Sequence, residues 1–168
     1  MLREELSARL TLKLSAASQE IVPGVWTTGE ISERTEFEGR GKAHRMVSEG
    51  QLVVDAYRDD MALVLQIDDR LTLLCGCCHA GLLNTLEHVE RVFAQPVVQI
   101  VGGLHLAGVT EDDLHRATAR LAAMPALQRI APCHCTGEAA LLTLAQTLGA
   151  NLVRSSPAGT AIEIGNNQ

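Results

Sequence analysis

Hydrophobic and polar positions become regular from residue 62 onward. Apolar runs at 62–67 and 71–75 flank the polar residues 68–70, and this arrangement predicts a β-hairpin. The β-branched run at 97–101 is typical of a buried strand, and 128–131 predicts another short strand. These runs supply the strands of a regular core.

Three further segments have helical periodicity. Residues 81–93 carry apolar side chains at helical spacing, and Pro96 ends that helix. Residues 110–124 begin with Thr110 as a predicted N-cap, followed by three acidic residues that suit the helix dipole. Residues 137–149 predict a third helix, closed by a glycine.

Short strands at 152–154 and 160–164 complete the predicted order β-β-α-β-α-β-α-β-β. Strands that alternate with helices indicate an α/β sheet with crossover connections. Upstream, residues 20–31 predict one or two short strands around a Pro-Gly pair, and residues 32–51 predict a long polar loop. We therefore expect a single domain over residues 1–168, in which an irregular segment with short strands (1–60) precedes a regular β/α core (61–168).

Composition excludes several classes of function. Apolar residues make up 46% of the chain, which fits a globular protein, and only 2% are aromatic, so base-stacking platforms for nucleic acids are not expected. The net charge of −6 disfavours contact with phosphate backbones. No apolar window of about 18 residues predicts a membrane span, and the N-terminus lacks the apolar core of a signal peptide. We expect a cytoplasmic protein with reduced thiols.

Three histidines follow three successive predicted strands. His79 lies after the strand 71–75, His105 after 97–101 and His134 after 128–131. Each sits in a loop with glycine or proline, and the carboxyl edge of an open α/β sheet is where ligands bind. Imidazole is the commonest protein metal ligand, and three protein ligands with one open position are typical of catalytic zinc sites. The alternative is that each histidine only makes hydrogen bonds within its own loop.

The other candidate groups point to less specific roles. His88 and His115 lie inside predicted helices, and the role of His44 in the polar loop is open. The five cysteines allow a thiolate-rich zinc site or a redox pair, but the chain lacks Cys-x2-Cys spacing. We favour a structural role for the four that flank the histidines: Cys77, Cys78, Cys133 and Cys135.

The loops "GCCHAG", "GGLHL" and "PCHCTG", in this order and spacing, resemble the later half of the metallo-β-lactamase superfamily. The most similar branch is that of 7,8-dihydropterin-6-methyl-4-(β-D-ribofuranosyl)-aminobenzene-5′-phosphate synthase-like metal-dependent hydrolases. The resemblance implies half of an αββα sandwich: one mixed sheet with helices on one face. It also implies that His79 and His134 ligate metal, with His105 where most members carry a bridging aspartate.

The superfamily's main metal motif, His-x-His-x-Asp-His, is absent from the sequence. Three histidines can hold one zinc ion or another divalent transition metal, but a complete site then needs more protein. The predicted strands are apolar on both faces, so the second face of the sheet should be covered by a second copy or by a separate chain carrying the first half.

These patterns favour a metal-dependent, hydrolase-like half-domain that acts on a small molecule if it is active. Two alternatives stay open. One is a non-catalytic, degenerate homodimer that binds a small ligand. The other is a thiol-redox protein that uses the cysteines beside His79 and His134.

Overall fold

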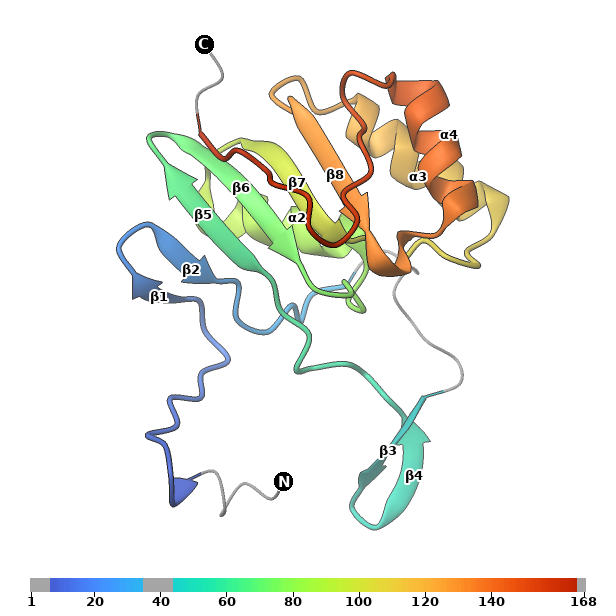
Figure 1. The fold of residues 1–168 in the computed structure, drawn as a ribbon. Helices are drawn as coiled ribbons and strands as arrows, with labels where there is room; N and C mark the ends of the chain where they lie inside the picture. Colours follow the sequence, from blue (N-terminus) through green and yellow to red (C-terminus); the bar gives the residue numbers. More distant parts are fainter. Residues whose placement is uncertain (1–6, 35–43, 166–168) are drawn as a thin grey trace.

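The computed structural model describes residues 7–34 and 44–165 (Figure 1). Its main element is a six-stranded sheet in the order β1-β2-β5-β6-β7-β8, and β3 and β4 form a separate two-stranded sheet. The strands are β1 (Gln19–Val22), β2 (Val25–Thr27), β3 (Arg45–Ser48), β4 (Gln51–Val54), β5 (Leu63–Ile67), β6 (Arg70–Cys75), β7 (Val97–Gly103) and β8 (Arg129–Cys133).

The main sheet is mixed, as predicted. β1, β2, β5 and β6 pair antiparallel, whereas β6, β7 and β8 pair parallel. The helices α2 (Leu82–Phe93) and α3 (Glu111–Ala122) make the two crossovers, and α4 (Glu138–Leu148) follows β8 after a short 3-10 turn (His134–Thr136). The order β-β-α-β-α-β-α predicted from residue 62 is confirmed.

The core lies between the sheet and its helices. Leu73, Ile100 and Ile130 occupy one register across β6, β7 and β8, and all three are fully buried. Apolar side chains of all three helices join the same cluster, among them Leu82, Leu86, Val89, Ala117, Leu121, Ala140 and Leu144. This packing fixes the strands whose carboxyl ends carry the candidate site.

The helix boundaries follow from local chemistry. The Thr110 side chain accepts a hydrogen bond from the amide of Asp113, so the predicted N-cap of α3 is confirmed. At the C-terminal end of α2, the cap residue Ala94 adopts a left-handed conformation, two residues before Pro96. None of the helices within the described ranges has the length and apolar character needed to cross a bilayer.

Part of the predicted polar loop 32–51 is instead a hairpin, so that prediction was wrong where β3 and β4 form. Glu49 and Gly50 both have positive φ angles, of 53° and 78°. Two such residues make the tight turn that suits the twist of a hairpin, and the strands on either side of it pair Ser48 with Gln51 and Val47 with Leu52. Residues 35–43 of the predicted loop lie outside the described residues.

The two predicted C-terminal strands differ in outcome. Residues 152–154 run beside β8 through the Val153–Ile130 bridge, where the Ile130 amide donates to the Leu152 carbonyl oxygen and the Arg154 amide donates to the Ile130 carbonyl oxygen, but they form no longer strand. The strand predicted at 160–164 was wrong, because those residues form no strand in the described structure. Pro157 accepts a backbone hydrogen bond from Thr160 in a turn, and this turn interrupts any extended pairing.

The chain after Val153 crosses the sheet face opposite α2, in front of β8, β7 and β6 (Figure 1). Ser156 anchors this segment through a hydroxyl bond to the Ala131 carbonyl oxygen. The Gln99 side-chain amide then donates to the Glu163 carbonyl oxygen at 3.3 Å. Part of the face that we expected a partner to cover is therefore covered by the chain itself, and coverage of the rest by a partner stays a prediction.

Candidate metal centre

The three histidines predicted to share a site follow three adjacent parallel strands. His79 lies in the loop after β6, His105 in the loop after β7, and His134 begins the turn after β8. Because these strands are parallel neighbours, their carboxyl ends meet at one edge of the sheet. The structure places all three histidines at that edge, and their role as metal ligands stays a prediction.

His79 and His105 are in direct ring contact. Their ring centroids are 4.6 Å apart and the rings are almost perpendicular. The Tyr57 ring lies 4.6 Å from His79 on centroids, and the His44 ring lies 6.4 Å from it. The Tyr57 hydroxyl also hydrogen-bonds His44 Nδ1. His44, next to the start of β3, and Tyr57, shortly after β4, therefore reach the same edge as the strand-end histidines.

His105 carries a buried nitrogen without a partner. Among the described residues, nothing hydrogen-bonds its Nδ1. Its backbone is left-handed, with φ 50°, a strained conformation for a residue with a side chain. Burial, aided by the nearby His79, holds the pKa of His105 below its ordinary value. The neutral ring that results is the form that binds metal.

His134 lies against two thiols rather than against the other histidine rings. Its Nε2 is 2.9 Å from Cys77 Sγ. The Cys135 thiol donates to the Cys77 carbonyl oxygen at 3.1 Å. One ligand atom from each of these three residues lies within 4.8 Å of the other two, which is close enough to share a metal ion.

Two of the cysteines, Cys78 and Cys135, have raised pKa values. All five carry free thiols. Cys78 is buried beside Thr85, and its hydrogen bond with Cys75 together with burial raises its pKa. Burial also raises the pKa of Cys135 to about 11, with Cys77 adding to the shift. Thiols of this kind are protonated at neutral pH, which disfavours the thiol-redox alternative unless a cation is bound.

His88 and His115 lie on helices, as the sequence predicted, and away from the candidate site. His88 Nε2 bonds the Thr28 carbonyl oxygen, and its other ring nitrogen bonds Arg91. His115 lies on the exposed face of α3, where 64% of its side chain is accessible. Neither lies at the sheet edge.

The sequence analysis placed Cys77 and Cys135 beside the candidate histidines but favoured a structural role for them, and it left the role of His44 open. It did not identify Tyr57 as a neighbour of the site. The signal for the two cysteines was present, since each lies within two residues of a candidate histidine, in loops after strands that share a sheet. No signal of that kind existed for His44 and Tyr57, which reach the edge from the irregular N-terminal part.

The donors at this edge fit a transition metal. They offer imidazole nitrogens, one of them buried without a partner, and thiol sulfurs. Magnesium and calcium prefer oxygen ligands, whereas zinc and related ions prefer nitrogen and sulfur. The nitrogen and sulfur donors of the site therefore favour zinc or a related transition-metal ion over magnesium or calcium.

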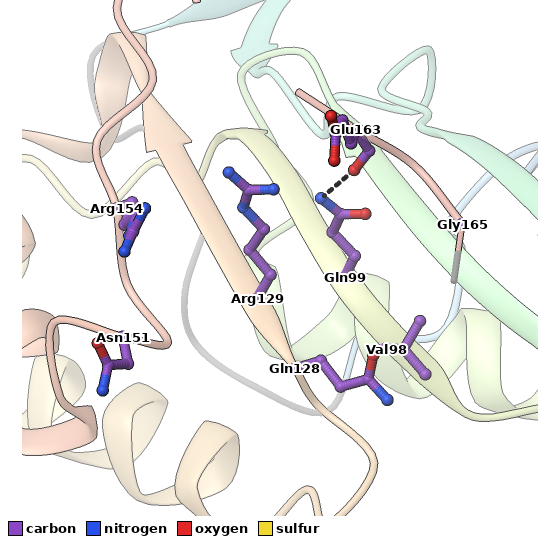
Figure 2. Close-up of a pocket in the computed structure, with 8 residues that line it drawn as sticks. All are labelled: Val98, Gln99, Gln128, Arg129, Asn151, Arg154, Glu163 and Gly165. Carbon is purple, nitrogen blue, oxygen red and sulfur yellow. Dashed lines mark hydrogen bonds between the residues drawn. The ribbon is translucent and has the colours of Figure 1, made fainter. Parts of the chain in front are cut away.

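A separate pocket of about 250 Å³ lies at the opposite ends of β7 and β8, beneath the C-terminal segment. Figure 2 shows Arg129 and Gln99 on the sheet, with Glu163 on the segment above them. Its lining is polar, but it contains no histidine or cysteine. It is therefore distinct from the candidate metal centre.

No family model matches the sequence. An uncharacterised protein of Methanocaldococcus jannaschii is 27% identical over 145 residues, covering 86% of this chain and 53% of the relative. The 7,8-dihydropterin-6-methyl-4-(β-D-ribofuranosyl)-aminobenzene-5′-phosphate synthase of the same organism is 28% identical over 140 residues. This match covers 80% of this chain and 46% of that relative. The chain thus spans about half the length of the curated relatives it matches.

The fold has a solved counterpart. The crystal structure of a metal-dependent hydrolase of the β-lactamase superfamily matches with a TM-score of 0.76 and 22% identity, covering 93% of this chain and 59% of that one. The resemblance predicted from the three histidine loops is confirmed: the chain is similar to the 7,8-dihydropterin-6-methyl-4-(β-D-ribofuranosyl)-aminobenzene-5′-phosphate synthase branch and has the α/β fold of part of a β-lactamase-superfamily hydrolase.

Proposed function

We propose that this chain is the metal-binding part of a metal-dependent hydrolase of the metallo-β-lactamase type. The metal is zinc or a related divalent ion, and His79 and His105 are its ligands. Because the chain spans about half of the relatives it matches, the proposal includes a partner chain or a second copy that completes the active site.

The observation that carries this proposal is the contact between His79 and His105. Two imidazoles meet at the edge of the sheet where α/β proteins bind ligands. His105 Nδ1 is buried without a partner within the described residues, and such a nitrogen costs about 1–3 kcal/mol. A metal–nitrogen bond would remove that cost.

A third ligand would come from His134, as the sequence predicts, or from His44. The first lies in the neighbouring loop and already contacts Cys77. The second lies 6.4 Å from His79 on ring centroids and is oriented by the Tyr57 hydroxyl. Both residues reach the same edge, so removing each in turn separates the two possibilities.

Each group at the edge has a defined part in this proposal. A bound zinc ion would supply a Lewis acid and lower the pKa of a water molecule. His79 and His105 would hold the ion through ring nitrogens, one of which, His105 Nδ1, is buried without a partner among the described residues. The Tyr57 hydroxyl holds the His44 ring in place beside His79.

Zinc content tests this proposal. We expect the His79→Ala and His105→Ala variants, dialysed against zinc, to retain less zinc per protein than the unaltered chain, measured by elemental analysis. His115→Ala is the matched control, because His115 is an exposed histidine away from the edge. Equal zinc in all four proteins would contradict the ligand assignment. Failure of the zinc-loaded chain, alone or with its partner, to hydrolyse any chromogenic ester would contradict the hydrolase assignment.

The partner part of the proposal is supported by the exposed hairpin β3–β4. Leu52 and Val47 expose 75% and 69% of their surface. An isolated two-stranded hairpin is marginally stable in water, and apolar residues on both of its strands favour burial against protein. A second copy of the chain would bury this surface.

We expect light scattering to give a mass near twice 18.0 kDa for the unaltered chain. Leu52→Asp should shift the protein to monomer, because it places a charge in the apolar contact. Leu142→Asp, at a 60% exposed position on α4, is the control and should stay dimeric. A monomer at every concentration would contradict a second copy as the partner.

A further inference from the structure

Three side chains from two loops converge next to the histidine pair. Cys77 comes from the loop after β6, while His134 and Cys135 come from the turn after β8. Cys77 Sγ contacts His134 Nε2 at 2.9 Å, and one ligand atom from each of the three lies within 4.8 Å of the others. Among the described residues this is the group that meets the geometry of a metal site.

These separations suit a tetrahedral ion. Zinc bonds of about 2.3 Å to sulfur and about 2.0–2.1 Å to nitrogen put neighbouring ligand atoms roughly 3.5–3.8 Å apart. The sulfur–nitrogen contact of 2.9 Å would open by less than an ångström, and the other separations already lie below 4.8 Å. Small side-chain rotations are therefore enough for binding.

The surrounding backbone leaves room for this cluster. Gly103 lies beside it, and a Cβ added there would meet Cys135 Sγ at 2.8 Å and His134 Cδ2 at 3.3 Å. His134 itself has φ 49°, a left-handed conformation that costs free energy for a residue with a side chain. The absence of a side chain at Gly103 and the strained turn at His134 together bring the imidazole to Cys77.

We propose that Cys77, His134 and Cys135 form a thiolate-rich zinc site, distinct from the His79–His105 pair, so that of the two candidate third ligands for that pair His44 is the one that remains. Two thiolates and one neutral imidazole balance the charge of a divalent ion, and thiolates select zinc over magnesium or calcium. Three protein ligands leave one position open for water or for a group from a partner chain. This site does not rest on the proposed hydrolase function.

Two other uses of the cluster explain less of its geometry. A nucleophilic Cys77–His134 pair would give Cys135 no part, although its sulfur lies within reach of both. A Cys77–Cys135 disulfide would give His134 no part, although its ring directly contacts one of the two sulfurs. A metal ion uses all three side chains at once.

Cobalt(II) binding to the reduced full-length chain tests the site, because cobalt in a zinc site with thiolates gives an intense near-ultraviolet charge-transfer band. We expect the unaltered chain to show this band. Cys77→Ser, Cys135→Ser and His134→Ala should each weaken cobalt binding at the site by at least about 10–100-fold. Excess zinc should abolish the band by displacement.

Two control variants separate this site from its neighbours. Cys133→Ser removes a half-buried thiol adjacent to His134 that is not part of the cluster, and it should leave the band unchanged. His79→Ala should also leave it unchanged, even where it lowers total metal content. Far-ultraviolet circular dichroism of the serine variants, which change little volume, verifies that they fold.

Three results would overturn the site. One is the absence of a thiolate band in the reduced protein. Another is an equal loss of the band in Cys133→Ser and Cys77→Ser. The third is a Cys77–Cys135 disulfide, seen by mass spectrometry after mild oxidation, in a chain whose reduced form binds no cobalt. None of these outcomes decides whether His79 and His105 bind metal. That question is answered separately, by the zinc content of the His79→Ala and His105→Ala variants.

Discussion

Gly102→Ala is expected to lower the free energy of unfolding by about 3 kcal/mol or more. Gly102 pairs with Cys75 across β7 and β6, and its φ is +119°, a conformation that side chains rarely adopt. A Cβ at this position would lie 1.9 Å from the Cys75 carbonyl oxygen. Because that neighbour is backbone, the two strands would have to separate at the edge that carries His79 and His105.

Urea denaturation followed by circular dichroism measures this loss. Gly108→Ala is the matched control: its φ is +76°, but nothing lies within 4 Å of an added Cβ. The control should lose only the conformational cost, about 1–2 kcal/mol. An equal loss in both variants would show that the close approach of β6 and β7 is not the reason for the glycine.

The fold of the core was predictable because its pattern is local. Leu82, Leu86 and Val89 are spaced to face one side of α2, and all three are fully buried as that spacing indicates. Strand and helix order then follows, since a strand–helix–strand unit returns parallel to its start. The positions of His79 and His105 after successive strands were predictable for the same reason.

The contacts made by the site were not predictable in this way. Whether His134 faces His79 or Cys77 depends on a left-handed backbone at His134 and on the space left by Gly103. Neither property has a periodic signal. His44 lies directly before β3, the first strand of a hairpin, and its ring lies near His79 at the sheet edge. The polar composition of residues 32–51 predicted a loop there, so the sequence did not indicate this contact.

The C-terminal error has a similar physical origin. Residues 160–164 carry isoleucine at alternate positions, 162 and 164, as a strand could, yet the edge of β8 is already hydrogen-bonded by the backbone of residues 152–156. The chain instead turns at Pro157 and crosses the sheet, where Gln99 supplies a hydrogen bond to the Glu163 backbone. Polar side chains inside otherwise apolar strands, Gln99 in β7 and its neighbour Thr72 in β6, were the local indication that this face of the sheet is not covered by apolar residues alone.

The three strand-end loops hold one another in place through a few hydrogen bonds. The amide of Gly103 donates to the Gly76 carbonyl oxygen, and that of Ala107 donates to the carbonyl oxygen of Cys135. Thr136 adds a side-chain link, because its hydroxyl accepts from the Leu104 amide and donates to the Cys133 carbonyl oxygen. The geometry of the candidate ligands therefore depends on residues that do not touch a metal.

Thr136→Val is expected to lower the free energy of unfolding by about 2–4 kcal/mol. The residue is 3% exposed, and valine matches its shape but removes both hydrogen bonds at 3.2 Å and 2.7 Å. The Leu104 amide and the Cys133 carbonyl oxygen would then lose these partners in a buried place. Urea unfolding measures the loss, and hydrogen exchange at the Leu104 amide should become faster.

Two variants separate the hydroxyl's role from that of packing. Thr136→Ser keeps both hydrogen bonds and should retain most of the stability, losing only the contacts of one methyl group, about 1 kcal/mol. Thr143→Val, at an exposed position on α4 where the hydroxyl bonds Ala139, should change stability by less than about 0.5 kcal/mol. If Thr136→Ser were as unstable as Thr136→Val, the methyl group rather than the hydroxyl would join the loops, and the strand-end histidines would be held by packing alone.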